Sequence, residues 1–216
     1  KILVSELGMS FEGEMERLER LYTEGVRLIT LTWNFENCFG YPNSDDSVVM
    51  NQGLKPFGIE AVERMNELGI IVDVSHLSDG GFWDVMKYSK KPAIASHSNA
   101  RRECGHRRNL TDEMIRALAE KGGISGINFY PAFLSEENKA TVDDLVRHIV
   151  HMYHMGGEEF VAIGTDFDGF EGAVDGLEHM GKMPEFYEAL RKRKFTDSQI
   201  EKFCYKNALR VIKEVC

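Results

Sequence analysis

The sequence is short of the features that mark several classes of protein. Only four cysteines occur in 216 residues, and none forms a CxxC pair, so a disulfide framework and a zinc ribbon are excluded. No run of about 18 apolar residues occurs, so no membrane-spanning helix is expected. No low-complexity stretch divides the chain. We therefore expect a single domain over residues 1–216, with free thiols in a reducing compartment, and hence a cytoplasmic protein.

The chain also has fewer basic than acidic residues. The chain has 26 lysines and arginines against 35 acidic residues, which gives a formal net charge of −9. A negative field repels phosphate backbones, so nucleic acid is not expected as a partner. The remaining composition, with 43% hydrophobic and 28% charged residues, is that of a globular protein with a substantial core.

Short β-branched runs alternate with amphipathic stretches along the chain. Apolar residues spaced by three, as at Ile59, Val62 and Met65, predict helices. Gly69 is typical of the residue after a helix, and Thr111 followed by two acids predicts a helix start. The predicted strands are 2–5, 26–32, 69–75, 92–96, 123–129 and 160–164, and the predicted helices are 11–24, 57–68, 80–88, 111–121, 141–155, 183–193 and 197–215.

This alternation predicts an α/β fold with parallel strands joined by right-handed crossovers. Two architectures fit, an open doubly wound sheet and a closed (β/α)8 barrel. The six predicted strands are fewer than a closed barrel contains, so either the sheet is open or two βα units are absent from this chain. Polar residues end nearly every predicted strand. Because all strand ends of a barrel converge on one mouth, whereas an open sheet uses only those near its switch point, this pattern favours the barrel.

The polar residues that end the strands are of the kinds that bind metal or move protons. His76 and His97 end neighbouring strands, and each follows a serine. Two neutral imidazoles and a carboxylate such as Glu6, which ends the first strand, suit Zn²⁺ or a similar divalent cation. A carboxylate outside the coordination shell, from Asp166 or Asp168, could accept the proton of a water that the metal makes acidic.

Four arginines follow His97 on the next loop, where a guanidinium could hold a substrate carboxylate through two hydrogen bonds. They are Arg101, Arg102, Arg107 and Arg108. Plainer readings stay open, because strand-end histidines are often structural, an Asp-Phe-Asp-Gly segment can be a turn, and an arginine run can be a solvated loop. Three further histidines, His148, His151 and His154, lie on a predicted outer helix and are interpreted as helix surface or packing.

Assembled, these residues resemble the motifs of the renal (membrane) dipeptidase family of zinc peptidases and its bacterial members. The resemblance runs from Ile2 to about Val215, and it depends on the order and spacing of several motifs together. The family has a (β/α)8 barrel and a two-zinc site that hydrolyses dipeptides. The resemblance thus implies a TIM-type barrel of the metal-dependent hydrolase kind, a Zn²⁺ cofactor, a dipeptide substrate and a homodimer. The strongest motifs are Asp73-Val74-Ser75-His76, Ser96-His97-Ser98, Arg107-Arg108-Asn109-Leu110-Thr111-Asp112 and Ile163-Gly164-Thr165-Asp166-Phe167-Asp168-Gly169.

The resemblance also implies a role for each matching residue. Glu6 is similar to the carboxylate that bridges the two metals. His76 and His97 resemble the two imidazole ligands of the second metal. Asp166 resembles the acid/base residue, and Arg108 resembles the arginine that holds the free carboxylate of the dipeptide.

Trp33 stands where the animal enzymes have a substrate-contacting histidine, and Tyr130 lies in a similar motif; both are taken as substrate contacts. The His-x-Asp motif that supplies the other ligands of the first metal is missing from this sequence. We therefore interpret the chain as a piece of the barrel that begins at its third strand. Two rivals stay open: a related barrel hydrolase for another amide, ester or lactam, and a truncated relative that binds metal without turnover.

Overall fold

The structure, a computed structural model, describes residues 3–5, 13–137 and 139–216. The chain folds into two compact units. The first contains residues 1–95, 121–123 and 211–216, and the second contains residues 96–120 and 124–210. The single domain expected over residues 1–216 stays a prediction.

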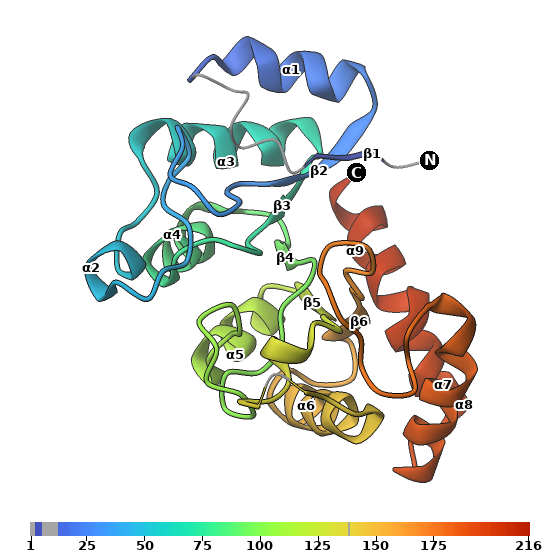
Figure 1. Ribbon diagram of the computed structural model, residues 1–216. Coiled ribbons are helices and arrows are strands. Elements are labelled where there is room, and N and C mark those ends of the chain that lie inside the picture. Colours follow the sequence, from blue (N-terminus) through green and yellow to red (C-terminus); the bar gives the residue numbers. More distant parts are fainter. Residues whose placement is uncertain (1–2, 6–12, 138) are drawn as a thin grey trace. The chain divides into compact units, whose positions relative to one another are not determined.

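The first unit contains strands β1 (Leu3–Ser5), β2 (Val26–Thr30), β3 (Ile71–Asp73) and β4 (Ile94–Ala95), and helices α1 (Met15–Thr23), α2 (Ser47–Met50), α3 (Pro56–Leu68) and α4 (Asp79–Tyr88). The strands lie in the order β1-β2-β3-β4, and each neighbouring pair is parallel. Helix α3 lies beside both α1 and α4 (Figure 1). The alternation of strand and helix predicted from the sequence is therefore confirmed here.

Helix α3 shows how the sequence sets these elements. Pro56 lies in its first turn, where the missing N–H would have no helical partner. Ala61, Val62 and Met65 are fully buried, as their spacing predicts. The helix ends at Gly69, whose φ of 78° is left-handed; a residue with a Cβ would be strained there.

The second unit contains α5 (Asp112–Glu120), β5 (Ile124–Ile127), a 3-10 helix (Pro131–Phe133), α6 (Val142–Gly156), β6 (Val161–Ile163), a second 3-10 helix (Met180–Lys182), α7 (Met183–Lys192), α8 (Asp197–Glu201), a π-helical segment (Lys202–Lys206) and the start of α9 (Asn207–Val215). Strands β5 and β6 are parallel, with Ile127 opposite Ile163. Helix α6 packs against α5 and α7. This unit therefore continues the same alternation.

Differences from the predicted elements lie mainly at their ends. Each observed strand falls inside a predicted one, and β2 to β6 are shorter than predicted. The helix predicted over 197–215 is confirmed as one continuous helical run, in which a π-helical segment, Lys202–Lys206, lies between α8 and α9. The sequence pattern also does not predict α2, which begins after Asp46, whose carboxylate accepts the Val48 N–H.

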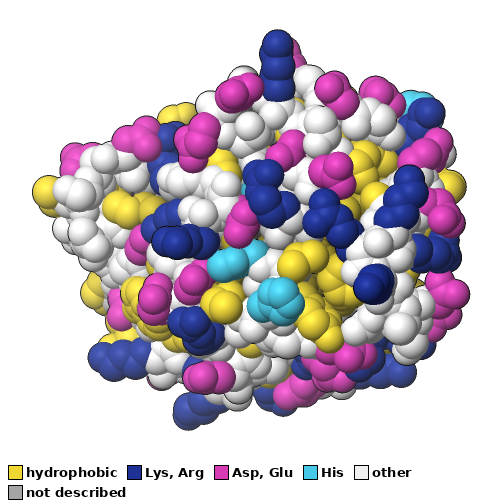
Figure 2. All heavy atoms as spheres, turned by 90° about the horizontal axis from the view of Figure 1, so that it is seen from below, with side chains coloured by type: hydrophobic (Ala, Val, Ile, Leu, Met, Phe, Trp, Pro, Cys, Tyr) yellow, Lys and Arg dark blue, Asp and Glu magenta, His cyan; other side chains and the backbone are white. Residues whose placement is uncertain are grey.

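Charge is mixed over the described surface. On the face shown in Figure 2, acidic and basic side chains are interspersed, and histidines lie among apolar side chains. Within the described part of the chain, no helix combines the length and the apolar character needed to cross a membrane.

Candidate active site

His76 lies just beyond β3, where the backbone enters a left-handed turn. Its φ is 67°, which is unfavourable for a residue with a Cβ. The turn is held by a hydrogen bond of 2.7 Å from the Asn43 N–H to the His76 carbonyl oxygen. The ring is also oriented, because its Nδ1 lies 3.2 Å from Asn34 Oδ1. With that oxygen accepting, Nδ1 carries the proton and Nε2 carries the lone pair, which is the form of imidazole that binds metal.

His97 follows β4 and is placed by close contacts of its neighbours. It is buried, and its Nδ1 lies 2.7 Å from Ser96 Oγ. The Ser98 N–H donates to the Gly126 carbonyl oxygen at 2.9 Å. A Cβ on Gly126 would stand 2.1 Å from the Ser96 carbonyl oxygen, and one on Gly164 would stand 1.9 Å from it. Glycine at both positions therefore allows the approach of backbone that sets His97.

Asp166 follows β6 and, like His76, has a left-handed backbone, with φ of 60°. Its carbonyl oxygen accepts the Gly169 N–H at 2.9 Å, and its Oδ2 accepts a hydrogen bond from Asn128 Nδ2 at 3.1 Å. Asp168 shares the left-handed backbone but is exposed. The two aspartates that the sequence left as alternatives therefore differ, since Asp166 is half-buried and oriented by an amide.

The arginines of the loop that follows His97 differ in their contacts and in their burial. Arg101 donates to the carbonyl oxygens of Asn109 and Arg107 and so holds the backbone of its own loop. Arg108 is only 6% exposed, and its guanidinium carbon lies 5.4 Å from the centroid of the Phe133 ring. A guanidinium over an aromatic ring is attracted by the negative face of the ring, so Phe133 fixes the place of the Arg108 charge.

The two predicted aromatic contacts differ in exposure. The ring of Tyr130 lies 4.9 Å from that of Phe133 and 5.0 Å from that of Phe170. Trp33 is 42% exposed and packs edge to face on Phe35, with 5.9 Å between the ring centroids. Tyr130 is therefore fixed by its neighbours, whereas Trp33 presents an open apolar surface.

The three histidines of α6 lie in or beside helix packing, in line with the interpretation of their spacing. His148 is fully buried; its Nδ1 accepts the Ala100 N–H and its Nε2 donates to the Leu134 carbonyl oxygen, both at 3.2 Å. Burial lowers the pKa of His148 to about 4, so this ring is neutral at pH 7. His151 is paired with two carboxylates, and His154 is exposed.

The donor chemistry of the two predicted imidazole ligands fits a divalent cation. Each ring has its Nδ1 beside an oxygen, that of Asn34 for His76 and that of Ser96 for His97. Partners of this kind orient the imidazoles of metal sites. Glu6 lies outside the described residues. Within residues 3–5, 13–137 and 139–216, no three His, Cys, Asp or Glu side chains form a group that could hold a metal. His76 is in the first unit and His97 in the second, and their binding to one ion stays a prediction.

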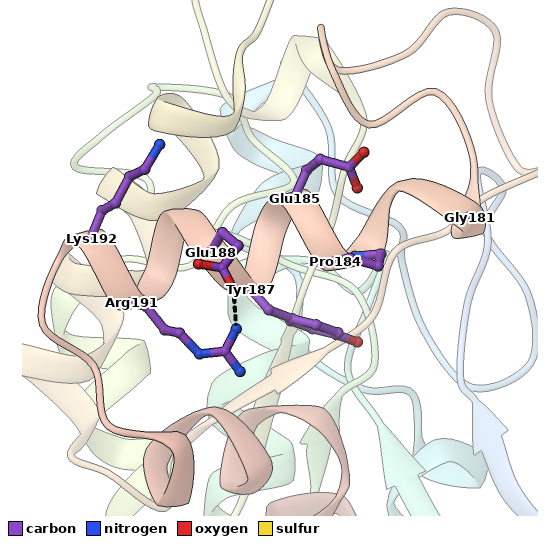
Figure 3. Close-up of a pocket in the computed structure, with 7 residues that line it drawn as sticks. All are labelled: Gly181, Pro184, Glu185, Tyr187, Glu188, Arg191 and Lys192. Atoms are coloured by element: carbon purple, nitrogen blue, oxygen red, sulfur yellow. Dashed lines mark hydrogen bonds and ion pairs between the residues drawn. The ribbon is translucent and has the colours of Figure 1, made fainter.

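A pocket lies along the exposed side of α7, between residues 181 and 192 (Figure 3). Two of its charged groups are paired with each other, since Arg191 forms ion pairs with Glu188 and with Asp197. None of the site residues predicted from the sequence lines this pocket. The chemistry expected from the motifs is therefore not located on α7.

Reasoning from the sequence missed residues that support the site. Asn99 and Asn109 are buried polar residues, and Gly126 and Gly164 allow the close approach of Ser96. A signal was present, because each asparagine lies within two residues of a candidate ligand or of the candidate carboxylate-binding arginine. Their hydrogen-bond partners, however, are remote in the chain.

Comparison with known proteins identifies the family of the chain. Residues 2–216 match the family described as membrane dipeptidase (peptidase family M19). An uncharacterized protein in the pqqA 5′ region of Klebsiella pneumoniae is 36% identical over 215 residues, which are 95% of this chain and 78% of that protein. An uncharacterized dipeptidase of Schizosaccharomyces pombe is 37% identical over 201 residues, 91% of this chain and 48% of that protein. The crystal structure of the dipeptidase AC, a metallopeptidase of family M19, superposes with a TM-score of 0.92 at 27% identity, covering 99% of this chain and 65% of that one.

These matches define what the chain shares with its relatives. It spans about half of the yeast dipeptidase and about two thirds of the solved dipeptidase. The parallel strands, the intervening helices and the superposition confirm the predicted fold class, an α/β barrel fold of the metal-dependent hydrolase kind. The motifs around His76, His97, Arg108 and Asp166 all lie within the matched residues. The chain belongs to the membrane dipeptidase family, peptidase family M19.

Proposed function

We propose that this chain carries the catalytic groups of a metal-dependent dipeptidase that uses Zn²⁺. The observation that carries the proposal is that the second unit contains both an oriented carboxylate and a buried arginine. Asp166 is held by the amide of Asn128, and Arg108 is held over Phe133. Dipeptide hydrolysis needs a group that transfers a proton and a group that binds the free carboxylate of the substrate.

In this proposal Glu6, His76 and His97 would be among the ligands of the two-cation site that the family resemblance implies. When bound, such a cation makes a water molecule acidic enough to attack at neutral pH and polarises the scissile carbonyl. Asp166 accepts the proton of the attacking water on its Oδ1 while Asn128 holds Oδ2. The carbon–nitrogen bond then breaks, and Asp166 returns the proton to the nitrogen of the leaving amine.

Arg108 sets the length of the substrate. Its guanidinium receives the free carboxylate of the C-terminal residue through two hydrogen bonds, and the next peptide bond then lies at the reacting centre. Longer peptides place an amide where the carboxylate should be and are rejected. Tyr130 and Trp33 contact the substrate side chains.

A second candidate function is favoured by Trp33. A tryptophan with 42% of its surface exposed replaces the histidine that contacts dipeptides in the animal enzymes. The same groups would then hydrolyse another amide, an ester or a lactam. A third alternative is a relative that binds metal without turnover, and metal analysis separates it from the first two.

The experiment is a substrate panel with metal control on the full-length protein. Dipeptides, N-acyl amino acids and lactones are assayed with Zn²⁺, with Mn²⁺ and with a chelator. The proposal expects dipeptide turnover that needs metal and is lost in His97→Ala. Dipeptide turnover that is indifferent to chelation, or unchanged in His97→Ala, contradicts it, and preference for another substrate class favours the second candidate.

Metal analysis addresses the cofactor separately. Two zinc ions per chain support the dinuclear catalytic site, whereas one ion or none favours the non-catalytic relative. We further propose a cytoplasmic homodimer. All four cysteines are free thiols, which supports a reducing compartment, and the family resemblance supports the dimer, to be tested by light scattering.

A further inference from the structure

We propose that a network of three buried asparagines, Asn99, Asn109 and Asn128, fixes the position of Arg108 relative to Asp166. Asn128 is the positioning residue for the Asp166 carboxylate. Asn99 and Asn109 connect Asn128 to the Arg108 seat, which is the loop that carries Arg108 together with the Phe133 ring under its guanidinium. This inference rests on the proposed function, and all five residues lie in the second unit.

The first link is the contact between Asn128 and Asp166. Asn128 Nδ2 donates to Asp166 Oδ2 at 3.1 Å, and Asn128 Oδ1 accepts the Tyr130 N–H at 2.6 Å. An amide side chain has a donor end and an acceptor end, and both ends are used here. Turning the amide over would place its oxygen against the carboxylate and its hydrogens against an N–H. The Asp166 carboxylate is therefore oriented by a group that cannot reverse.

The second link is the contact between Asn99 and Asn128. Asn99 Oδ1 accepts the Asn128 N–H at 2.7 Å, and Asn99 Nδ2 donates to the Asn128 carbonyl oxygen at 3.0 Å. The side chain of Asn99 thus pairs with both backbone groups of Asn128, as a neighbouring strand would. Asn99 and Asn128 have no exposed surface, so breaking these bonds would leave buried polar groups unsatisfied.

The third link reaches the seat of Arg108. Asn109 Oδ1 accepts the Asn99 N–H at 3.3 Å, and Asn109 Nδ2 donates to the carbonyl oxygens of Cys104 and Phe133 at 2.9 and 2.8 Å. The ring of Phe133 is the one that lies under the Arg108 guanidinium. Asn109 therefore fixes both the loop that carries Arg108 and the ring on which Arg108 rests.

The network has a catalytic consequence. In the proposed reaction Arg108 anchors one end of the substrate while Asp166 moves a proton at the peptide bond. The separation of these two groups must match the substrate, because a small misplacement of reacting groups reduces the rate strongly. Hydrogen bonds in a buried network reinforce one another, so three amides hold this separation better than surface contacts would.

The test compares variants of the full-length protein in metal-supplemented dipeptide hydrolysis. Asn128→Asp retains the Oδ1 acceptor for the Tyr130 N–H but replaces the amide donor with a like charge facing Asp166. Its kcat is expected to fall by about 10- to 100-fold, the usual range for loss of an outer-shell partner, while KM changes by less than about threefold. Asn99→Ala is expected both to lower kcat and to raise KM, because it disturbs Asp166 and the Arg108 seat together.

Asn207 offers a matched control in the same unit. It is 2% exposed, and its Nδ2 donates to the carbonyl oxygens of Glu158 and Val161, at the start of β6 rather than at its end. Asn207→Ala is expected to lower Tm but to leave kcat unchanged below the unfolding transition. Should Asn128→Asp fail to fold, Asn128→Ser provides the same measurement.

The outcomes separate two failures. If the wild-type protein hydrolyses no dipeptide with any metal, the proposed function is wrong and the network inference falls with it. If the wild type is active and the folded Asn128 variants keep a wild-type kcat, the network inference alone is overturned. It is also overturned if their loss of kcat is no larger than that of Asn207→Ala, because the asparagines are then only structural.

Discussion

The two units hold their predicted site residues in different ways. In the second unit, Asp166 and Arg108 depend on asparagines whose hydrogen bonds are made in the interior. In the first unit, His76 pairs with the exposed Asn34, and Trp33 has an exposed ring. Buried hydrogen bonds thus hold the two residues that are proposed to move a proton and to bind a carboxylate. The exposed Trp33 ring, in contrast, can adapt to different substrate side chains.

The backbone at the strand ends sharpens the contrast. His76 and Asp166 both take left-handed conformations, which for such residues is on the order of 1–3 kcal/mol of strain. A strained backbone at a site residue is a sign of function rather than of stability. The turn at Asp166 is closed by the Gly169 N–H, and its side chain by Asn128. The following predictions test whether the interior support of the second unit matters more than the open support of the first.

The largest effect is expected at Asp166. Asp166→Asn retains the left-handed turn, which asparagine tolerates, but cannot accept a proton. Its kcat should fall by about 10²- to 10⁴-fold, the range for loss of a general acid–base group. Asp168→Asn is the matched control, since Asp168 has a similar φ of 70° and is exposed. Steady-state dipeptide hydrolysis measures both, and equal kcat values for the two variants would contradict the assignment.

The next effect is on stability and concerns the core of the second unit. Burial lowers the pKa of His148 from 6.5 to about 4, so between these values the unfolded chain binds a proton that the folded chain does not. The free energy of unfolding should therefore rise with pH from about 4 to 6.5, by about 3 kcal/mol at most. Urea unfolding at a series of pH values measures this slope.

Two variants isolate the source of this slope. His148→Gln should flatten it, because glutamine does not titrate, although the variant should be less stable at pH 7. His154→Gln should keep the wild-type slope, since His154 is exposed. A slope that survives in His148→Gln would show that another group is responsible.

The third effect is on substrate binding by Arg108. Arg108→Lys keeps the charge but removes the planar pair of donors, so KM for dipeptides should rise by about 10- to 100-fold, as expected for loss of a charge-assisted hydrogen bond. Arg102→Lys, at an exposed arginine of the same loop, should leave KM unchanged. Dipeptide amides, which lack the carboxylate, should bind both variants and the wild type equally weakly. A preference of the wild type for the amides would remove Arg108 from this role.

Local patterns account for what the sequence predicted well. The apolar spacing of α3 and the left-handed Gly69 depend on residues within the helix itself. His76, His97 and Asp166 were identified because each comes one or two residues after an apolar run in the sequence. Interactions over a few residues are readable in this way, and the strand and helix order follows from them.

Long-range interactions account for what the sequence did not predict. Asn99 reaches Asn128 across 29 residues, and Asn109 reaches Phe133 across 24. Nothing in the segments around these asparagines names the partner. The selection of Arg108 among four arginines came from the family resemblance, and the loop sequence alone does not reveal that Arg108 is buried. The π-helical segment inside the predicted helix 197–215 likewise contacts a strand that is remote in the sequence, β6.

The smallest effect is expected at the exposed aromatic of the first unit. Trp33→Ala should lower Tm about as much as Trp83→Ala, because the two residues are similarly exposed, at 42% and 43%, and kcat should be unchanged. KM should rise by only about two- to fivefold, and mainly for dipeptides with bulky apolar side chains. The reason is that the binding free energy lost is proportional to the apolar area that the substrate no longer buries. Trp83→Ala is the matched control, because Trp83 on α4 is 43% exposed and is not a predicted contact. A uniform rise in KM for all dipeptides would indicate that Trp33 contacts the peptide backbone, as a histidine would. The contrast between a rigid second unit and an adaptable first unit would then fail at this residue.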